Sequence, residues 1–332
     1  LRDIHGEMRF LAAGRVQAAM GSPRAVTPYN CFVSDIIDDS MVDGDRSIMN
    51  MATKAAATMR KGGGIGYSFG TLRPRGAGIA KLQSSSSGPI SMMGIYDATC
   101  LTISSSGHRR GAQMGVLPIW HPDIEEFIRA KHPPKEAEPI LEALDASEPG
   151  SEEWERWYQA LQAVLPLTGF NVSVGVTDDF MEALTSGADE YPLRFGGKTY
   201  STVNPAALWE LLMRSTWDYA EPGVLFLDTI NRMNNLWYCE EIFATNPCGE
   251  QPLPPNGACL LGSFNLTRYM HQRTDGSWYL SDDHLREDIP DVVRAMDNVV
   301  DRATYPLREQ EIEAHSKRRM GLGVTGVANA FE

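Results

Sequence analysis

The chain has 332 residues, of which 42% are hydrophobic and 22% charged, and a formal net charge of −13. This composition fits a globular protein with a large core. No apolar run approaches the roughly 18 residues of a membrane span. The acidic balance argues against direct nucleic-acid binding, which needs a basic face. The start, "LRDIHGEMRF", lacks the pattern of a signal peptide.

Five cysteines in a chain without an export signal favour reduced thiols over a disulfide framework, so we expect a cytoplasmic protein. The sequence contains neither a Cys-x-x-Cys pair nor a His-Glu-x-x-His pattern, and we expect no metal site in this chain. The glycosylation sequons at 171 and 265 are then chance matches.

Helical patterns cover residues 43–64, 121–132, 204–223 and about 282–303. In the third, Asn204 is the expected N-cap and Pro205 occupies the first turn. An acidic segment lies between the second and the third of these helical patterns. Residues 136–155 carry eight Asp or Glu and no Lys or Arg, so 133–160 is expected to be a solvated surface excursion.

Short apolar runs begin at residues 31, 114, 170 and 223 and alternate with these helices. Strand-sized runs between helices predict an α/β fold with a parallel component, in one domain covering 1–332. In such folds the loops and strand ends carry the chemistry.

Two glycine-rich segments are candidate nucleotide sites. Residues 62–76, "GGGIGYSFGTLRPRG", could bring backbone amides and an arginine to a phosphate, or could be a helix C-cap and a tight turn. Residues 104–115, with His108 and two arginines, could contact a nucleotide or form a solvated turn. "GLGVTG" at 321–326 matches a dinucleotide pattern, but charged residues precede it where a buried strand should be, so we reject that interpretation.

The cysteines differ in their surroundings. Cys100 and Cys239 have apolar and aromatic neighbours, which predicts core packing. Cys248 and Cys259 instead lie in a segment broken by prolines and glycines, which must be a shaped loop. "NPCGE" at 246–250 puts an amide, a thiol and a carboxylate within reach of one small ligand.

Five ordered motifs together resemble the catalytic subunit of ribonucleotide reductase, of the class I or class II type, including compact viral forms. They are "TPYNCFVS" at 27–34, the 62–76 glycine segment, "RRGAQMG" at 109–115, "NPCGEQPL" with "CLLGSFNL" at 246–266, and "RRMGLGVTG" at 318–326. The resemblance implies a ten-stranded α/β barrel with a finger loop through its centre. It also implies thiyl-radical reduction of ribonucleotides to deoxyribonucleotides for DNA synthesis.

Matched residue by residue, the resemblance assigns five catalytic residues. Cys248 becomes the thiyl radical that removes hydrogen from C3′ of the ribose. Glu250 takes the 3′-hydroxyl proton, Asn246 binds the ribose hydroxyls, and Cys31 with Cys259 forms the reductant pair. These residue types suit the chemistry, because a thiol exchanges hydrogen atoms with carbon and two thiols supply two electrons by closing a disulfide.

The resemblance also implies binding residues. Substrate contacts fall on Asn246 and on Thr27, Gly63, Gly64 and Arg110. A deoxynucleotide or ATP effector, which sets substrate choice, would bind at Asp39, Ser40, Arg73, Arg75 and Gln113.

The implied substrate is a ribonucleoside di- or triphosphate, and the implied assembly is a homodimer. The radical would come from adenosylcobalamin or from a metal-containing small subunit, and a thioredoxin- or glutaredoxin-type protein would reduce the disulfide. The family continues well past residue 332, so the barrel is expected to be incomplete here. Two alternatives are a glycyl-radical type of barrel enzyme and a non-catalytic nucleotide-binding regulator. The second would leave the cysteines scattered.

Overall fold

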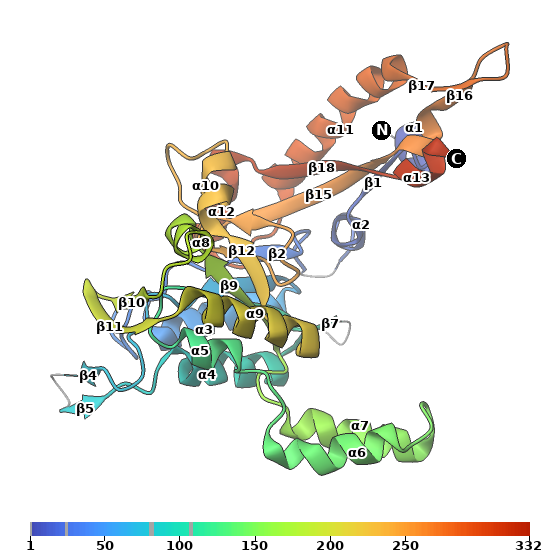
Figure 1. Ribbon diagram of the computed structural model, residues 1–332. Helices are drawn as coiled ribbons and strands as arrows, with labels where there is room; N and C mark the ends of the chain where they lie inside the picture. Colours follow the sequence, from blue (N-terminus) through green and yellow to red (C-terminus); the bar gives the residue numbers. More distant parts are fainter. Residues whose placement is uncertain (1, 24–25, 80–82, 106–108) are drawn as a thin grey trace.

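The computed structural model describes residues 2–23, 26–79, 83–105 and 109–332 (Figure 1). Its main sheet has eight strands in the order β1-β15-β2-β3-β8-β9-β12, with β18 beside β15. Five of them run parallel, in that order: β2 (Cys31–Val33), β3 (Gly64–Ser68), β8 (Gln113–Pro118), β9 (Phe170–Val176) and β12 (Gly223–Phe226).

The other end of the sheet is mixed. β15 (Ala258–Asn265) is antiparallel to β2 and to β1 (Phe10–Ala12), and parallel to β18 (Met320–Thr325). The fold is therefore α/β with a parallel component, as the alternating pattern predicts. Its sheet is a curled half-barrel. The ten strands expected from the resemblance are not reached in one sheet within the described residues.

Helices cover the outside of the sheet, with α3, α4, α5 and α9 along one side in Figure 1. The helices are α1 (Arg2–Gly6), α2 (Gly14–Ala19), α3 (Ile48–Arg60), α4 (Pro89–Thr102), α5 (Ile124–Ile128), α6 (Glu138–Asp145), α7 (Glu152–Val164), α8 (Asp178–Thr185), α9 (Pro205–Tyr219), α10 (Leu227–Met233), α11 (Asp282–Arg302), α12 (Arg308–Lys317) and α13 (Val327–Phe331), with 3-10 turns η1 (Lys135–Ala137) and η2 (Leu266–Tyr269).

Small antiparallel pairs complete the secondary structure. They are β4 (Gly78–Ile79) with β5 (Ser84–Ser85), β6 (Ser104–Ser105) with β7 (Arg109–Arg110), β10 (Tyr191–Phe195) with β11 (Lys198–Val203), β13 (Ala244–Thr245) with β14 (Pro252–Leu253), and β16 (Met270–Gln272) with β17 (Trp278–Leu280).

The helix predictions hold with one exception. α9 begins at Pro205, and the Asn204 side chain accepts a hydrogen bond from the Ala207 amide at 2.9 Å, as expected of an N-cap. The helix expected over 121–132 is only α5, five residues long, because turns occupy both of its ends. The acidic segment forms the hairpin of α6 and α7, which projects from the body in Figure 1.

The two faces of the sheet pack differently. Phe32, Ile65 and Val172 point outward into the large core shared with the helices. The opposite, inner face carries a separate cluster that includes Ala244 of β13 and Leu253 of β14; its members on the main sheet are Cys31, Val33, Met114, Val116 and Cys259. Side chains alternate between faces along a strand, so both cysteines are directed to the inner face, towards β13 and β14.

Candidate active site

The finger is the loop between the short strands β13 and β14, which pair antiparallel. Its two arms are closed by hydrogen bonds at the tip. The backbone amide of Asn246 donates to the backbone carbonyl of Gln251 at 3.1 Å, and the backbone amide of Gln251 donates to Asn246 Oδ1 at 2.9 Å. Gly249 has φ of 82°, a conformation that favours glycine, and this lets the chain turn tightly between them. The loop is therefore shaped and held, as the prolines and glycines predict.

Glycines of β3 let the finger lie directly on the sheet. A Cβ atom on Gly66 would lie 1.7 Å from the Thr245 carbonyl oxygen, and one on Gly64 would lie 2.8 Å from Pro247 Cγ. Gly63 leaves room in the same way for Phe32. The first part of the 62–76 segment is thus a buried central strand, and the interpretation of it as a phosphate loop is wrong there. Its glycines serve close packing.

Replacing Gly66 with alanine is expected to destabilise the fold by about 3 kcal/mol and to displace the finger, because the new methyl group meets a backbone oxygen that cannot rotate away. Urea unfolding of the variant measures the loss. The matched control is Gly94→Ala, an exposed site in α4 with nothing within 4 Å of the new Cβ. That change should stabilise by about 0.5–1 kcal/mol, since alanine favours a helix. Equal stability of the two variants would contradict this packing.

Cys31 and Cys259 are cross-strand partners on β2 and β15. Directly opposite residues of an antiparallel pair have Cα atoms about 4.5–5.5 Å apart, which falls within the range of disulfides. Both are thiols in this structure. The strands therefore place the two sulfurs where a disulfide could close without rearrangement of the backbone.

The side-chain amide of Asn246 connects the finger to Cys31 of this cysteine pair. Its Nδ2 group donates to Cys31 Sγ at 3.1 Å and to Glu250 Oε2 at 2.7 Å. The Cys31 thiol lies 3.8 Å from Glu250 Oε1. Asn246 is fully buried, whereas Glu250 is exposed. A thiol, an amide and a carboxylate that are distant in sequence thus meet at one point.

Cys259 is held from the same loop. Its Sγ atom lies 3.2 Å from Gln251 Oε1, to which it donates. Burial, followed by the neighbouring Cys31, raises the pKa of the Cys259 thiol to about 12. Because this pKa lies far above neutral pH, Cys259 is held as the protonated thiol.

Cys248 lies at the tip, two residues from both Asn246 and Glu250, so its Cα is within about 7 Å of theirs. Unlike Cys31 and Cys259, it is exposed. Its side chain borders an open pocket of about 620 Å³ whose other walls include Asn171, Ser173 and Val224. The tip therefore presents one accessible thiol, and two buried thiols contact Asn246 and Gln251, the residues that close it.

The barrel-domain model for ribonucleotide reductase matches residues 29–332 of this chain. The chain belongs to that family. It is 35% identical over 90% of its length to a vitamin B12-dependent ribonucleoside-diphosphate reductase of Thermoplasma acidophilum, and 38% identical over 90% to one of Mycobacterium tuberculosis. It is 26% identical over 91% to a ribonucleoside-diphosphate reductase subunit alpha of Chlamydia muridarum. The chain spans about a third of these proteins: 34%, 38% and 28% of their lengths.

The resemblance also assigns Thr27, Gly64 and Arg110 to substrate binding, and these residues lie in different parts of the structure. Thr27 is fully buried, and its Oγ1 atom accepts a hydrogen bond from the Tyr29 amide at 3.3 Å. Gly64 pairs with Cys31 across β2 and β3, beside the site. Arg110 lies on β7, but its side chain is outside the described part of the structure, as is all of His108.

Three of the residues that the resemblance assigns to an effector, Asp39, Ser40 and Arg73, line one pocket of about 880 Å³. Arg73 Nε donates to Asp39 Oδ2 at 2.6 Å, and the Arg73 backbone amide lies 3.3 Å from Asp39 Oδ1. The pocket thus joins the loop before α3 to the segment after β3, with a charged pair in its wall.

The other two residues that the resemblance assigns to the effector, Gln113 and Arg75, lie outside this pocket. Gln113 is buried in the core, where its amide accepts from the Tyr67 hydroxyl at 2.8 Å and donates to the Tyr96 carbonyl at 3.1 Å. Arg75 is drawn to α5, where its Nε donates to Glu126 at 2.8 Å. Both side chains are committed to other partners, and neither is among the residues that line the pocket.

The other two cysteines, Cys100 and Cys239, differ in burial. Cys100 is buried on α4, as expected. Cys239 is exposed, and the prediction of core packing was wrong for it. It follows α10 in a turn whose aromatic residues, Trp237 and Tyr238, also face solvent, so apolar neighbours in sequence did not imply a core position.

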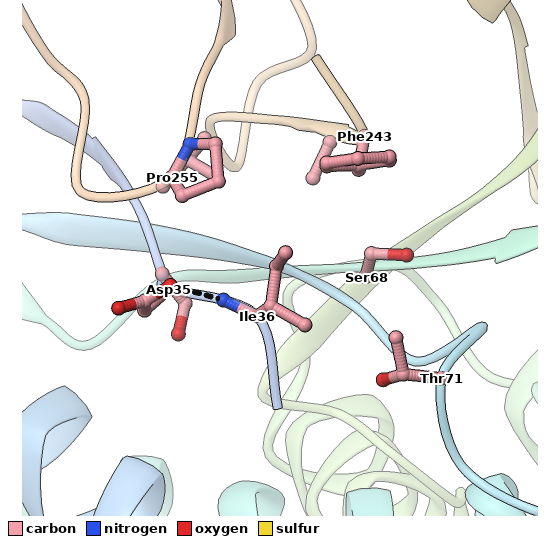
Figure 2. A pocket seen from close by; sticks show the side chains of 9 residues that line it. Asp35, Ile36, Ser68, Thr71, Phe243 and Pro255 are labelled. Atoms are coloured by element: carbon pink, nitrogen blue, oxygen red, sulfur yellow. Dashed lines mark hydrogen bonds between the residues drawn. The ribbon is translucent and has the colours of Figure 1, made fainter. Parts of the chain in front are cut away.

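The base of the finger, at Phe243 and Pro255, also borders a hollow. A small hollow of about 50 Å³ separates Phe243 and Pro255 from the segments that follow β2 and β3 (Figure 2). Its opposite wall is formed by Asp35, Ile36, Ser68 and Thr71 (Figure 2).

Two side chains at the site were missed from sequence. Gln251 holds Cys259 and closes the finger, and Asn171 on β9 donates to the Pro247 carbonyl at 2.6 Å. The position of Gln251 within "NPCGEQPL" was a signal for the first. For the second, the signal was a polar residue in the largely apolar run 170–176.

The described residues contain no group of three or more His, Cys, Asp or Glu placed to hold a metal ion. No helix among them is long and apolar enough to cross a membrane.

Proposed function

We propose that this chain is the catalytic barrel of an enzyme that reduces ribonucleotides to deoxyribonucleotides by a thiyl-radical mechanism, with a disulfide as the oxidised product. One observation carries the proposal: Cys31, Asn246 and Glu250 are joined by hydrogen bonds beside Cys259, with Cys248 on the same loop. Membership of the reductase family supports it.

In this mechanism Cys248, as a thiyl radical, removes the hydrogen atom from C3′ of the ribose. Glu250 takes the 3′-hydroxyl proton, which pushes electron density towards C2′ and assists departure of the 2′-hydroxyl as water. Asn246 orients the ribose hydroxyls. Cys31 and Cys259 supply two electrons and two protons and become a disulfide. Glu250 then returns its proton to the 3′-oxygen and Cys248 returns the hydrogen atom to C3′, so the atoms balance.

Adenosylcobalamin is the proposed radical source, because the relatives from Thermoplasma and Mycobacterium are named as vitamin B12-dependent. When bound, it supplies a radical able to take hydrogen from a thiol. The fit on the protein side is that Cys248 is exposed beside an open pocket, so its sulfur can be reached from outside. The alternative is a metal-containing small subunit, and the likeness to a subunit alpha keeps that alternative in the test.

The wider architecture is also a proposal. The eight-stranded sheet would be part of a ten-stranded barrel in the whole protein. That barrel would enclose the radical and protect it from quenching. The residues of this chain would form one domain. We further propose a homodimer in the cytoplasm, with a ribonucleoside di- or triphosphate substrate and a thioredoxin- or glutaredoxin-type protein as reductant.

Replacing Arg73 with alanine is expected to weaken binding of a deoxynucleotide or ATP effector about tenfold, because the guanidinium in the pocket wall would pair with phosphate. Substrate choice should blur while turnover without effector survives. Isothermal titration and mixed-substrate assays measure both. Arg75→Ala is the matched control, since Arg75 pairs with Glu126 and does not line this pocket. Equal losses of effector affinity in the two variants would show that the effector does not bind in this pocket.

The two alternatives account for less. A glycyl-radical type of barrel enzyme has no need of Cys31 opposite Cys259. A non-catalytic regulator would explain the pocket at Asp39, but it leaves the hydrogen-bonded cluster at the finger tip without a purpose.

The deciding experiment is an assay for deoxynucleotide formation with the full-length protein, a dithiol reductant and either adenosylcobalamin alone or a candidate small subunit. Product with adenosylcobalamin alone supports the proposed function and its radical source. Product only with the small subunit supports the function and rejects the source. No product under either condition rejects the function.

A further inference from the structure

β9 carries one polar side chain that reaches the finger. Phe170, Val172 and Val174 of this strand point into the large outer core. Asn171, between the first two, points to the opposite face, and it is the only exposed residue of the strand. A polar residue at this position costs nothing in the core and is directed at the finger tip.

The contact that Asn171 makes is specific. Its Nδ2 group donates to the carbonyl oxygen of Pro247 at 2.6 Å. A peptide unit is planar, so this oxygen lies in one rigid plane with the backbone nitrogen of Cys248. The hydrogen bond therefore fixes the orientation of the peptide unit that carries Cys248.

Pro247 is also held from its other side. The proline ring packs against Gly64 of β3, where an added Cβ atom would come within 2.8 Å of Cγ. β3 thus holds the ring and β9 holds the carbonyl group. With both fixed, the side chain of Cys248 leaves the loop towards the pocket that Asn171 and Ser173 help to line.

We propose that Asn171 is a positioning residue for Cys248: by holding the Pro247 carbonyl from β9, it sets the direction of the Cys248 thiol at the finger tip. The catalytic part of this inference rests on the proposed function. Hydrogen-atom transfer requires the sulfur to stand close to the reacting carbon, and a misplacement of about 1 Å can cost on the order of 100-fold in rate. The hydrogen bond from Asn171 supplies that alignment.

The test uses Asn171→Asp and Asn171→Ala in the full-length protein. Aspartate has nearly the same shape but at neutral pH only accepts hydrogen bonds, so it faces the Pro247 carbonyl with a repulsive oxygen. Gln272→Ala is the matched control, because Gln272 donates an exposed amide hydrogen bond to the Gly276 carbonyl at 3.1 Å in the β16–β17 hairpin. Each protein is assayed for kcat and KM. The rate at which iodoacetamide modifies each cysteine is measured by mass spectrometry.

We expect both Asn171 variants to lower kcat by about tenfold or more with KM changed less than about twofold, since alignment is lost and substrate contacts are kept. The alkylation rate of Cys248 should change by at least about threefold, while the rates of the buried Cys31 and Cys259 stay the same. Gln272→Ala should match the wild type in every measurement.

The alkylation rate separates positioning from general stability. If kcat falls while the alkylation rate of Cys248 is unchanged, or if all cysteines become more reactive together, the positioning role is overturned. If neither quantity changes, it is overturned as well. If the wild-type protein makes no deoxynucleotide but the Asn171 variants still change the reactivity of Cys248 alone, the reductase function fails and the positioning of this thiol stands.

Discussion

Replacing Cys248 with serine is expected to abolish deoxynucleotide formation and all radical chemistry on the substrate. A serine O–H bond is too strong to give its hydrogen to the radical source, and the loop has no second exposed thiol. The fold should be unaffected, because the side chain is exposed and the hydrogen bonds that hold the loop are made by other residues, among them Asn171, Asn246 and Gln251. Turnover by chromatography and circular dichroism measure the two effects.

Cys239→Ser is the matched control for this variant. Cys239 is also an exposed thiol, but it lies in the turn after α10 and not in the finger. Its replacement should leave turnover within about twofold of the wild type. A normal yield from Cys248→Ser, with reductant and the proper radical source present, would refute the proposed mechanism. A total loss in Cys239→Ser would show that the assay reports on thiols in general.

Much of the fold could be predicted because its elements are marked locally. The N-cap of α9 at Asn204 is a signal within a few residues, and the structure contains the predicted hydrogen bond. The apolar run 170–176 is β9 over its whole length. The run starting at Cys31 is a strand for only three residues. A strand ends where its neighbours stop pairing with it, and that information lies elsewhere in the chain.

The glycines show why the rest could not be predicted. Gly64 and Gly66 were open to a phosphate-loop interpretation, because a glycine permits any close approach of backbone and the sequence does not say what approaches. In the structure it is the finger, about 180 residues later in the chain, that lies against them. Gln113 illustrates the same limit, since the resemblance assigned it to an effector and its partners in the structure are Tyr67 and Tyr96.

The residues of the candidate site were identified by resemblance, and the structure gave their arrangement in space. "NPCGE" identified a shaped loop with a thiol and an acid, but the link from Cys31 to Cys259 depends on the pairing of β2 with β15. That pairing joins residues 228 positions apart, which is 259 minus 31, and no local pattern encodes it. Long-range strand pairing is set by the whole sheet.

Replacing either Cys31 or Cys259 with serine is expected to stop deoxynucleotide formation at a later stage than Cys248→Ser does. Cys248 remains able to remove the 3′-hydrogen, so the reaction begins. It cannot finish, because one thiol and one hydroxyl cannot close a disulfide and supply two electrons. The trapped intermediate should then decompose and release the free base, which chromatography detects.

The control for these buried thiols is Cys100→Ser, which also replaces a buried sulfur but on α4, away from the finger. It should lower stability and leave turnover per folded molecule unchanged. Cys259 is distinguished further by its protonation. Because its pKa is raised to about 12, this thiol keeps its hydrogen throughout the neutral range and should react slowly with alkylating and oxidising reagents, which need the thiolate. One disulfide formed for each deoxynucleotide, in the absence of outside reductant, is the expected ratio. Product formed by Cys259→Ser at the wild-type yield, with no base released, would remove the pair from the mechanism.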